Sequence, residues 1–554
     1  MSEKGGEKEF DFDENDPLLG LSAADLSGPK VTRRTMLKLL AATGVSLSSL
    51  WGMDSFVEAQ GTGGHLKAGW LTDQITTLDP AQINQILQFQ AASNVFNGLV
   101  HVDTELIPRG DLAKDWEVSE DGTEWTFKLR EGVLFHNGVE FTADDVLFTY
   151  NRSKDPEKSQ HAAVLEPVEK LEKLGKYSVK FTLKQPSAAF LIKVLERTSG
   201  RAMTIVNKEA IEEMGPTEYG IKPVGTGAFK VVEHKLGERL VLEKFDDYFI
   251  EGQPKLDKVT YFPIPEPSTL VSALKAGDVH ICDDIPDQFV PQLKASPNVE
   301  VKIGPGPGFQ SIFMNPHREP FTDQKVRLAM AKAIDRQELV DKALFGLGIP
   351  AYGPIPPAQK AFFQDLSDKS DQAFAPEEAR QLLADAGYSD SFETNVICTP
   401  ATKRRTQIAA NMLKENLGLT VNLKVMDWTV LITHFDNMEF DMLQLGSGAD
   451  LDPNDSLVDW FRTSSKFNGP KRPKSMEYGF YSNPEVDELV NKQRTTVDLD
   501  KRIEMVKELN LKISNDPAAI FLFHPTDDLA LNKKVKGFKF IPGLRDLHTV
   551  YLEE

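Results

Sequence analysis

The sequence is poor in cysteine. Cys282 and Cys398 are the only two cysteines in 554 residues, and they form no C-x-x-C pair. This excludes a four-cysteine zinc site, a thioredoxin-type redox motif and a disulfide-dense scaffold, and it allows at most one disulfide. The sequence also lacks an apolar run of about 18 residues, so we predict no permanent membrane span.

Positive charge is in deficit, with 63 Lys and Arg against 83 Asp and Glu, which gives a formal net charge of -20. A field of this sign repels phosphate backbones, so we expect no nucleic-acid partner. With 40% hydrophobic and 26% charged residues, the chain can bury a large core. Disordered and fibrous classes are therefore excluded, and two or more domains are predicted.

The N-terminal segment has the pattern of a targeting signal. Arg33 and Arg34 precede a short, weakly apolar stretch from Leu39 to Trp51, and the small residue Ala59 suits a cleavage site. The paired arginines resemble a twin-arginine export signal, so we predict a signal peptide over residues 1–59 and the twin-arginine export machinery as a partner. The alternative is an amphipathic N-terminal helix. No cysteine adjoins the cleavage site, so no lipobox anchor is expected and the mature protein should be soluble in the periplasm.

Helical and strand patterns alternate along the rest of the chain. Period-two alternation predicts strands at 125–129, 177–183 and 419–425, and the turn dipeptide Asp121-Gly122 predicts a hairpin over 115–130. Apolar stripes and end signals predict helices over 326–344, capped by Thr322 or Asp323, and over 376–387 and 403–417. Alternating helices and strands predict an α/β fold.

Signatures of catalysis are missing. The sequence has no H-E-x-x-H, G-x-S-x-G, Walker A or G-x-G-x-x-G motif, and the Gly304–Gly308 stretch has prolines where a phosphate loop needs backbone N–H groups. His280, Cys282 and Asp283 form the only grouping that suggests a metal, and the alternation around them favours a strand end. We therefore predict no metal, no cofactor and no enzymatic activity, and favour a binding protein.

The stretch from Asp111 to Val146 is more specific. It reads DLAKDWEVSEDG, WTFKLREGV, FHNG and FTADDV in order. This resembles the signature of the family 5 extracellular solute-binding proteins, the dipeptide, oligopeptide and nickel binders of ABC importers. Other stretches similar to family landmarks are Thr77–Pro80, Phe96–Val100, Pro223–Gly227, Pro320–Asp323, Ala333–Arg336, Leu382–Tyr388, Asn515–Ala519 and Val535–Phe538.

The resemblance covers residues 65 to 554 and implies the two-lobed periplasmic binding protein fold (type II, cluster C), with an extra inserted subdomain and a ligand cleft between the lobes. The implied first lobe comprises 65–97, 222–283 and 521–554. The implied subdomain is 98–221, and the implied second lobe is 284–520. Ligand would be enclosed by hinge closure.

A zwitterionic peptide needs a fixed cation for its carboxylate and a fixed anion for its amine. Resemblance to the dipeptide-binding branch implies that Arg404 or Arg405 holds the carboxylate and Asp450 the amine. A solvated first helical turn is the alternative for the arginines. Peptide-binding relatives usually carry Gly-Trp before that aspartate, whereas this chain has Gly-Ser-Gly-Ala, so Asp452 is the alternative anion. Trp428 resembles a family aromatic that lines the cleft, with core packing as the alternative.

These observations predict a monomeric periplasmic receptor that delivers a peptide-like solute to the transmembrane subunits of an ABC permease. The missing tryptophan leaves a non-peptide solute open, such as an opine, an oligosaccharide or a metal chelate. A secreted hydrolase using paired carboxylates, and a chaperone or sensor that feeds no transporter, are the competing hypotheses.

Overall fold

The computed structural model describes residues 63–197, 201–283, 285–389, 392–448, 451–465 and 467–553. The predicted signal peptide and its twin-arginine motif lie outside these ranges. Residues Thr62–Glu554 form one compact unit. Among the helices described, none has the length and apolar character needed to cross a membrane.

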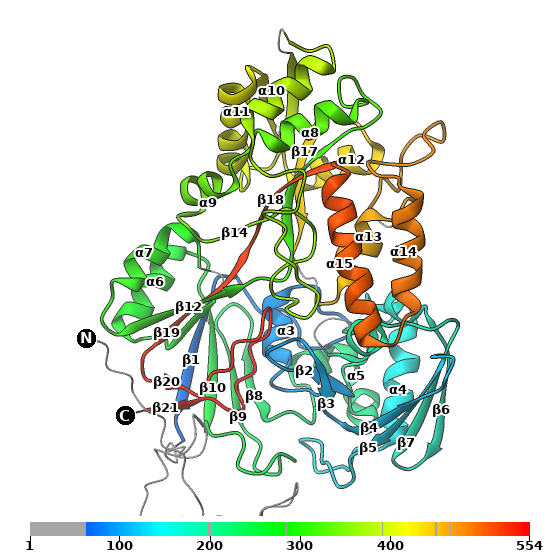
Figure 1. Ribbon diagram of the computed structural model, residues 1–554. Helices are drawn as coiled ribbons and strands as arrows, with labels where there is room; N and C mark the ends of the chain where they lie inside the picture. The colour runs from blue at the N-terminus through cyan, green and yellow to red at the C-terminus, as the bar shows by residue number, and fades with distance from the viewer. Residues whose placement is uncertain are drawn as a thin grey trace, which may run out of the picture. The chain divides into compact units, whose positions relative to one another are not determined.

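A seven-stranded mixed sheet forms the centre of the first lobe (Figure 1). Strand β1 (His65–Trp70) lies parallel to both β10 (Lys258–Pro263) and β11 (Ile281–Asp283). The full order is β12 (Val299–Pro305), β19 (Thr526–Asn532), β11, β1, β10, β9 (Arg239–Lys244) and β8 (Phe229–Lys235). Helices α6 (Pro267–Ala276) and α7 (Val290–Lys294) pack on one face, and α3 (Ile86–Ala92) contributes to the core on the other.

A six-stranded sheet forms the centre of the second lobe. Its order is β14 (Ile349–Pro350), β18 (Ala519–His524), β13 (Phe309–Met314), β17 (Met442–Ser447), β15 (Glu393–Cys398) and β16 (Thr420–Val425). Alternating side chains of β13 serve two cores: Ile312 faces one and Phe313 the other. The first core is covered by α8 (Gln324–Lys332), α9 (Arg336–Leu344), α10 (Pro376–Asp385) and α11 (Lys403–Leu417). The second is covered by α12 (Trp428–Asn437), α13 (Pro453–Phe461), α14 (Pro484–Thr495) and α15 (Leu499–Asn515).

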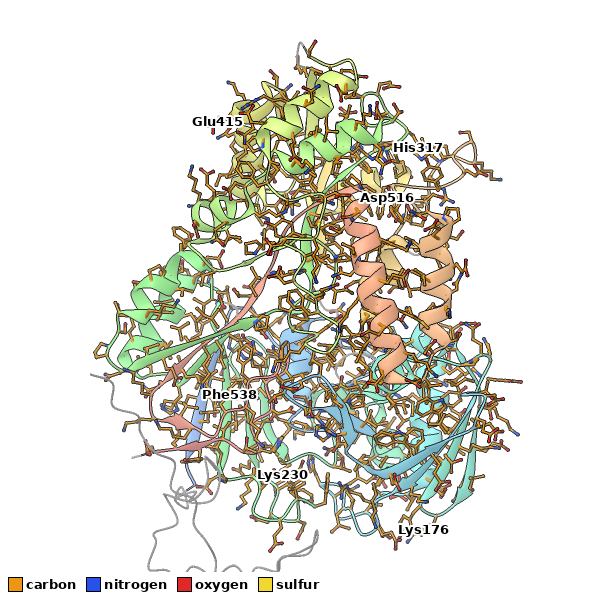
Figure 2. The ribbon with its side chains drawn as sticks, in the orientation of Figure 1. Lys176, Lys230, His317, Glu415, Asp516 and Phe538 are labelled. Carbon is orange, nitrogen blue, oxygen red and sulfur yellow. The ribbon has the colours of Figure 1, made fainter. Side chains whose placement is uncertain are left out.

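A four-stranded antiparallel sheet forms the subdomain, in the order β4 (Ala113–Val118), β5 (Glu124–Leu129), β7 (Ser178–Leu183) and β6 (Val168–Gly175). Helices α4 (Ala143–Lys154) and α5 (Lys208–Ile221), a 3₁₀ turn η2 (Ala162–Leu165) and a π-helical turn η3 (Leu191–Leu195) accompany it. Lys176, at the turn between β6 and β7, lies at the outer end of this sheet (Figure 2). Two-stranded ribbons pair β2 (Val100–Val102) with β3 (Pro108–Gly110), and β20 (Val535–Lys536) with β21 (Tyr551–Leu552).

Two chain connections join the seven-stranded and six-stranded sheets directly. Strand β12 continues into β13 through Gly306–Gly308, and β18 continues into β19 through Pro525. The strand order thus places β12 beside the first-lobe strands and β18 beside β13. The lobe boundaries remain predictions. Because β12 pairs with β19 and β18 pairs with β13, we propose that the first lobe extends to Pro305 and not only to the expected residue 283. For the same reason we propose that the second lobe extends to His524 and not only to residue 520.

Most of the predicted elements are confirmed. The hairpin is β4–β5, the other predicted strands are β7 and β16, and the helices at 376 and 403 are α10 and α11. The prediction of a single helix over 326–344 is wrong, because two separate helices, α8 and α9, lie in this range. Asp323 caps α8, whereas the Asp335 side chain accepts a hydrogen bond from the Glu338 amide and starts α9 anew. Cys282 and Cys398 are both buried and free.

Candidate ligand-binding site

The carboxyl ends of three strands of the six-stranded sheet meet at one edge. Strand β15 lies parallel to β16 and to β17, so Cys398, Val425 and Ser447 all end there. In open α/β sheets, ligands bind in the crevice outside such strand ends. The segments that follow these three strands carry the predicted site residues: α11 holds the arginines, α12 begins with Trp428, and the segment after β17 leads to Asp450 and Asp452.

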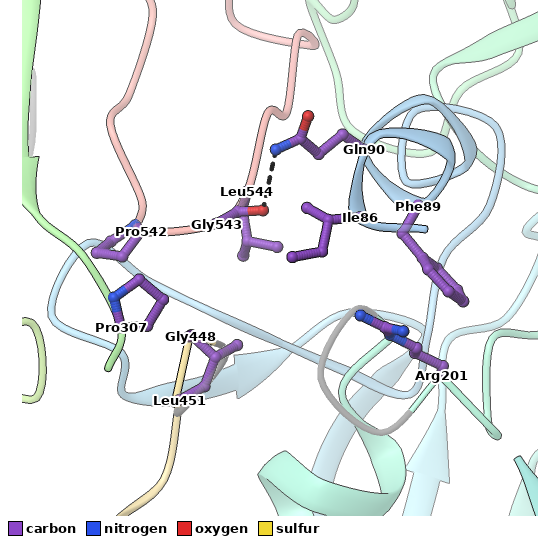
Figure 3. Close-up of a pocket in the computed structure, with 10 residues that line it drawn as sticks. All are labelled: Ile86, Phe89, Gln90, Arg201, Pro307, Gly448, Leu451, Pro542, Gly543 and Leu544. Carbon is purple, nitrogen blue, oxygen red and sulfur yellow. Dashed lines mark hydrogen bonds between the residues drawn. The ribbon is translucent and has the colours of Figure 1, made fainter. Parts of the chain in front are cut away.

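A pocket lies where the segment after β17 meets the first lobe, and Figure 3 shows it in close-up. The second lobe contributes Gly448 and Leu451, and the connection between lobes contributes Pro307. The opposite wall comprises Ile86, Phe89 and Gln90 of α3 with Pro542, Gly543 and Leu544. Residues from both lobes therefore enclose one space.

The pocket wall is mostly apolar, with polar groups at two places. The Gln90 amide donates to the Gly543 carbonyl oxygen at 3.4 Å, which ties α3 to the C-terminal segment (Figure 3). The Arg201 guanidinium lies 4.3 Å from the centroid of the Phe89 ring, a cation–π contact. Burial lowers the pKa of Arg201. The described residues that line the pocket therefore offer mostly apolar surface together with the Arg201 side chain.

Sequence reasoning missed Arg201, α3 and the Pro542–Leu544 segment. Arg201 has a backbone φ of 65°, which is rare for a residue with a Cβ and concentrates at functional sites. That signal is structural, and no local sequence pattern reveals it. The meeting of α3 with residues more than 450 positions away depends on tertiary packing alone.

Arg405 is a half-buried cation at the predicted site. Its Nη2 donates to the Gln310 side-chain oxygen at 3.2 Å, and its guanidinium lies 5.4 Å from the centroid of the Phe523 ring. Its Nε is buried and has no hydrogen-bond partner among the described residues. Burial lowers the pKa of Arg405 to about 10, against the opposing effect of Asp287. The Arg405 side chain therefore remains charged at neutral pH, and its Nε is a donor without a hydrogen-bond partner among the described residues.

Arg404 points to different surroundings. Its Nη2 donates to the Lys342 carbonyl oxygen at 2.6 Å near the end of α9, and its guanidinium lies 4.4 Å from the centroid of the exposed Phe345 ring. Arg404 is exposed. The two neighbouring arginines thus differ, and only Arg405 is carried forward as a candidate ligand contact.

Asp450 lies outside the described residues, although Gly448 and Leu451 on either side of it line the pocket. Asp452 is only 1% exposed, and Arg502 donates to both of its oxygens, at 2.8 and 2.5 Å. Asp452 also caps α13 by accepting from the Asn454 amide. Because both oxygens are engaged within the fold, Asp452 is not carried forward as an anion for a ligand.

Trp428 is 59% exposed at the first position of α12. This exposure argues against the core-packing alternative. Trp428 is not among the residues lining the pocket in the described part of the chain. Its contact with ligand stays a prediction.

Known proteins of similar sequence and structure match most of this chain. The chain is 28% identical over 496 residues to the oligopeptide-binding protein AppA of Bacillus subtilis. The aligned region covers 85% of this chain and 89% of that protein. The structure is similar to the periplasmic binding protein DppA from Helicobacter pylori in complex with the peptide STSA, with 26% identity, a TM-score of 0.70, and coverage of 90% of this chain and 100% of that one.

A further similar structure is AgaA from A. tumefaciens R10 in complex with agropinic acid, at 27% identity and a TM-score of 0.68, covering 89% of this chain and 99% of that one. These relatives confirm the predicted two-lobed α/β fold. The family model described as "Bacterial extracellular solute-binding proteins, family 5 Middle" matches residues 108–469, more than half of the chain. The chain therefore belongs to the family 5 bacterial extracellular solute-binding proteins.

Proposed function

We propose that this protein is the substrate-binding component of an ABC importer, which closes its two lobes over a peptide-like solute and delivers it to the membrane permease. The observation that carries the proposal is the pocket enclosed by α3 and Pro542–Leu544 from one lobe and by Gly448 and Leu451 from the other. A site shared by two lobes that are joined by narrow connections is suited to capture by hinge closure. The similarity to AppA and to DppA with its bound peptide supports a peptide as the solute.

In this proposal Arg405 holds the ligand carboxylate. A carboxylate removed from water needs a charged donor, and the Arg405 guanidinium supplies one. Gln310 fixes the guanidinium by accepting from Nη2 and also accepts from the Gln444 amide at 3.0 Å. The cation is thus held in place before ligand arrives, which reduces the ordering cost of binding.

Asp450 is proposed to hold the ligand amine, and Trp428 to cover part of the ligand. The segment after β17 leads past the pocket, since Gly448 and Leu451 both line it. The sequence around Asp450 lacks a large side chain on its N-terminal side. Small side chains there would leave room for a longer peptide.

Export follows from the N-terminal pattern. The paired Arg33 and Arg34 support secretion of a folded chain through the twin-arginine machinery, followed by removal of residues 1–59. The mature receptor then acts as a monomer in the periplasm and docks on the transmembrane subunits of its permease. Its ligand is released chemically unchanged, which distinguishes a receptor from a hydrolase on the same scaffold.

Native mass spectrometry of protein purified gently from its own periplasm tests the solute class. We expect a ladder of peptide masses that are released intact on denaturation. Cleaved products accumulating with time would overturn the receptor proposal in favour of the hydrolase. A single non-peptide mass that is released chemically unchanged would keep the receptor role and reject a peptide as the solute.

The carboxylate contact is tested on the captured peptide by calorimetry. Arg405→Met should weaken binding by at least about 2 kcal/mol, the scale for truncating a buried charged partner. Arg404→Met is the matched control, because the neighbouring arginine binds the Lys342 carbonyl instead, and it should leave affinity unchanged. Equal affinities of the two variants would refute the assignment of Arg405.

A non-peptide solute is the second candidate. The similar AgaA structure holds agropinic acid, so the scaffold accommodates an opine in that protein. An opine also carries carboxylates, and Arg405 would serve it equally. Competition between the native peptide and a panel of opines, oligosaccharides and metal chelates separates these solutes.

A further inference from the structure

An ion cluster joins the subdomain to the second lobe. Lys193 of η3, in the subdomain, extends its ammonium to α13 of the second lobe. Its Nζ forms ion pairs with Asp455 and, at 3.3 Å, with Asp459. The two carboxylates lie four residues apart on α13 and therefore share one face of that helix. One ammonium thus holds two carboxylates that belong to another part of the molecule.

The three side chains are largely withdrawn from water. Their exposed fractions are 34% for Lys193, 15% for Asp455 and 28% for Asp459. Burial raises the pKa of Asp455 to about 6, against the opposing effect of Lys193. Burial also lowers the pKa of Lys193, but the charges of Asp455 and Asp459 outweigh burial and raise that pKa above its usual value. Lys193 and Asp455 are therefore both charged at pH 7.5, and salt screens their pairing less than it screens an exposed pair.

An apolar cluster links this contact to the pocket of Figure 3. Ile192, the neighbour of Lys193, is buried together with Leu451 and Leu544, which both line the pocket. The other members come from the subdomain and from both lobes: Val102, Leu106, Ala358 and Ile541. Closure over the pocket and formation of the ion pairs therefore involve the same interface.

Opening of the lobes must separate the two sides of the ion cluster. The chain passes between the lobes at Gly306–Gly308 and at Pro525, so a hinge motion turns about these connections. Helices α13 and α14 lie on the opposite side of the molecule from β12 and β19, which adjoin the connections (Figure 1). A rotation at the connections therefore carries η3 and α13 apart and returns all three charged groups to water.

We propose that Lys193, Asp455 and Asp459 form a latch, which holds the subdomain against the second lobe in the closed receptor and slows release of the solute. The latch rests on the receptor function proposed above. Because its ion pairs exist in the closed form and not in the open form, they stabilise closure alone. Contacts of this kind act mainly on the rate of release, since capture begins from the open form.

Two further contacts join the same parts of the molecule. The Ala188 backbone amide donates to the carbonyl oxygen of Arg494, on α14, at 2.8 Å. Lys360 of the second lobe pairs with Glu105 of the subdomain at 2.9 Å, and both of these side chains are exposed. An exposed ion pair contributes little because water and salt screen it. Lys360 therefore provides a comparison for Lys193 at the same interface.

The rate of solute release from the mature full chain at pH 7.5 tests the latch. It is measured by exchange of the captured solute against its isotope-labelled form, followed by native mass spectrometry. Lys193→Met keeps the length of the side chain and leaves two carboxylates without their ammonium in the closed form. We expect release at least about tenfold faster than from the wild-type protein, because truncating a buried charged partner acts on dissociation. Lys360→Met is the matched control and should release solute at nearly the wild-type rate.

The possible results separate the latch from the receptor function. Capture of solute by both proteins with equal release rates for Lys193→Met and the wild type would overturn the latch alone. Capture of no solute by the wild-type protein would overturn the receptor function and the latch together.

A double variant distinguishes a lost ion pair from damage to the fold. Asp455 also accepts from the Asp452 backbone amide at the start of α13, so Asp459 is the carboxylate to change. Asp459→Asn combined with Lys193→Met leaves one unpaired negative charge fewer, and release should be slower than from Lys193→Met alone. A double variant that releases solute as fast as Lys193→Met would exclude the unpaired charges as the cause.

Zero-length cross-linking tests whether the contact follows closure. A carbodiimide activates a carboxyl group, which an adjacent lysine amine attacks to form an amide, while the carbodiimide leaves as a urea. Peptide mapping should find Lys193 joined to Asp455 or Asp459, at a higher yield with solute bound than after its removal. Lys173 and Asp144, paired at 2.7 Å within the subdomain, should cross-link equally in both states. An absent Lys193 cross-link, or one of equal yield in both states, would refute the latch.

Discussion

The backbone amide of Gly306 donates a hydrogen bond to the carbonyl oxygen of Pro525 at 2.8 Å. The two connections between the sheets are therefore bonded to each other at the crossing. A Cβ added at Gly306 would lie 2.8 Å from that same oxygen and 3.2 Å from the backbone carbon of Thr526. Both of these neighbours are backbone atoms that cannot rotate away, so the crossing requires glycine.

Gly306→Ala should lower the free energy of unfolding by about 1 to 3 kcal/mol, the usual cost of forcing an extra group into a packed site. Urea denaturation measures the loss. Gly175→Ala is the matched control, since a Cβ there meets nothing within 4 Å. Equal stability of the two variants would show that the crossing tolerates a side chain.

Arg502→Met should destabilise the fold by about 3 to 5 kcal/mol, because it leaves the buried Asp452 carboxylate without its partner. Combining it with Asp452→Asn should restore part of the loss, since the amide carries no charge and can still cap α13. Thermal and urea unfolding of the single and double variants measure this coupling. A double variant no more stable than Arg502→Met would count against the unpaired charge as the cause.

Stability should fall in mild acid because of buried histidines. His524 donates from Nδ1 to the Gly308 carbonyl oxygen at 2.8 Å, and burial lowers its pKa to about 4. A histidine with a lowered folded pKa stabilises the fold above its unfolded pKa of about 6.5, and this contribution is lost as pH falls toward 4. The loss for His524 should be up to about 3 kcal/mol.

Urea midpoints from pH 7.5 down to pH 4 measure that loss. His524→Gln should flatten the pH dependence while retaining a side-chain donor. His136, whose pKa burial also lowers to about 4, should leave a residual slope. His434→Gln, on the exposed side of α12, is the control. An unchanged slope in His524→Gln would exclude this histidine as the source.

Trp428→Ala should change the free energy of unfolding by no more than about 0.5 kcal/mol, because the side chain is exposed. It should weaken the captured solute by about fivefold, the scale of one aromatic contact. Calorimetry with the native ligand measures this. Val430→Ala, an exposed residue two positions further along the same helix, is the control. Identical affinities for both variants would remove Trp428 from the site.

Local patterns predicted the elements well where burial is one-sided. Trp125, Phe127 and Leu129 alternate because β5 buries one face, and Gly418 ends α11 in a left-handed conformation with φ of 73°. The break between α8 and α9 was missed, because the apolar stripe continues through it while Asp335 restarts the hydrogen bonding. An apolar stripe reports which face is buried and does not report where the backbone bonds stop.

The site was only partly predictable. Arg405 was one of two adjacent arginines, and only the tertiary neighbours Gln310 and Phe523 distinguish it from Arg404. The sequence makes Asp452 a candidate anion for the ligand amine. In the fold, however, Asp452 is paired with Arg502, which lies 50 residues further along the chain. Such pairings are set by packing between distant segments, and the spacing of residues along the chain does not encode them.

The position of β19 has a consequence for biosynthesis. This strand, at Thr526–Asn532, lies between β12 and β11 and pairs with both of them in the sheet. The Pro542–Leu544 wall of the pocket comes later still. A chain emerging from the ribosome therefore makes β1, β10 and β11 long before the strand that joins them to β12. A translation product that stops before β19 would hold an unfinished sheet with an open edge, so binding competence requires that β19 and the Pro542–Leu544 segment have been made.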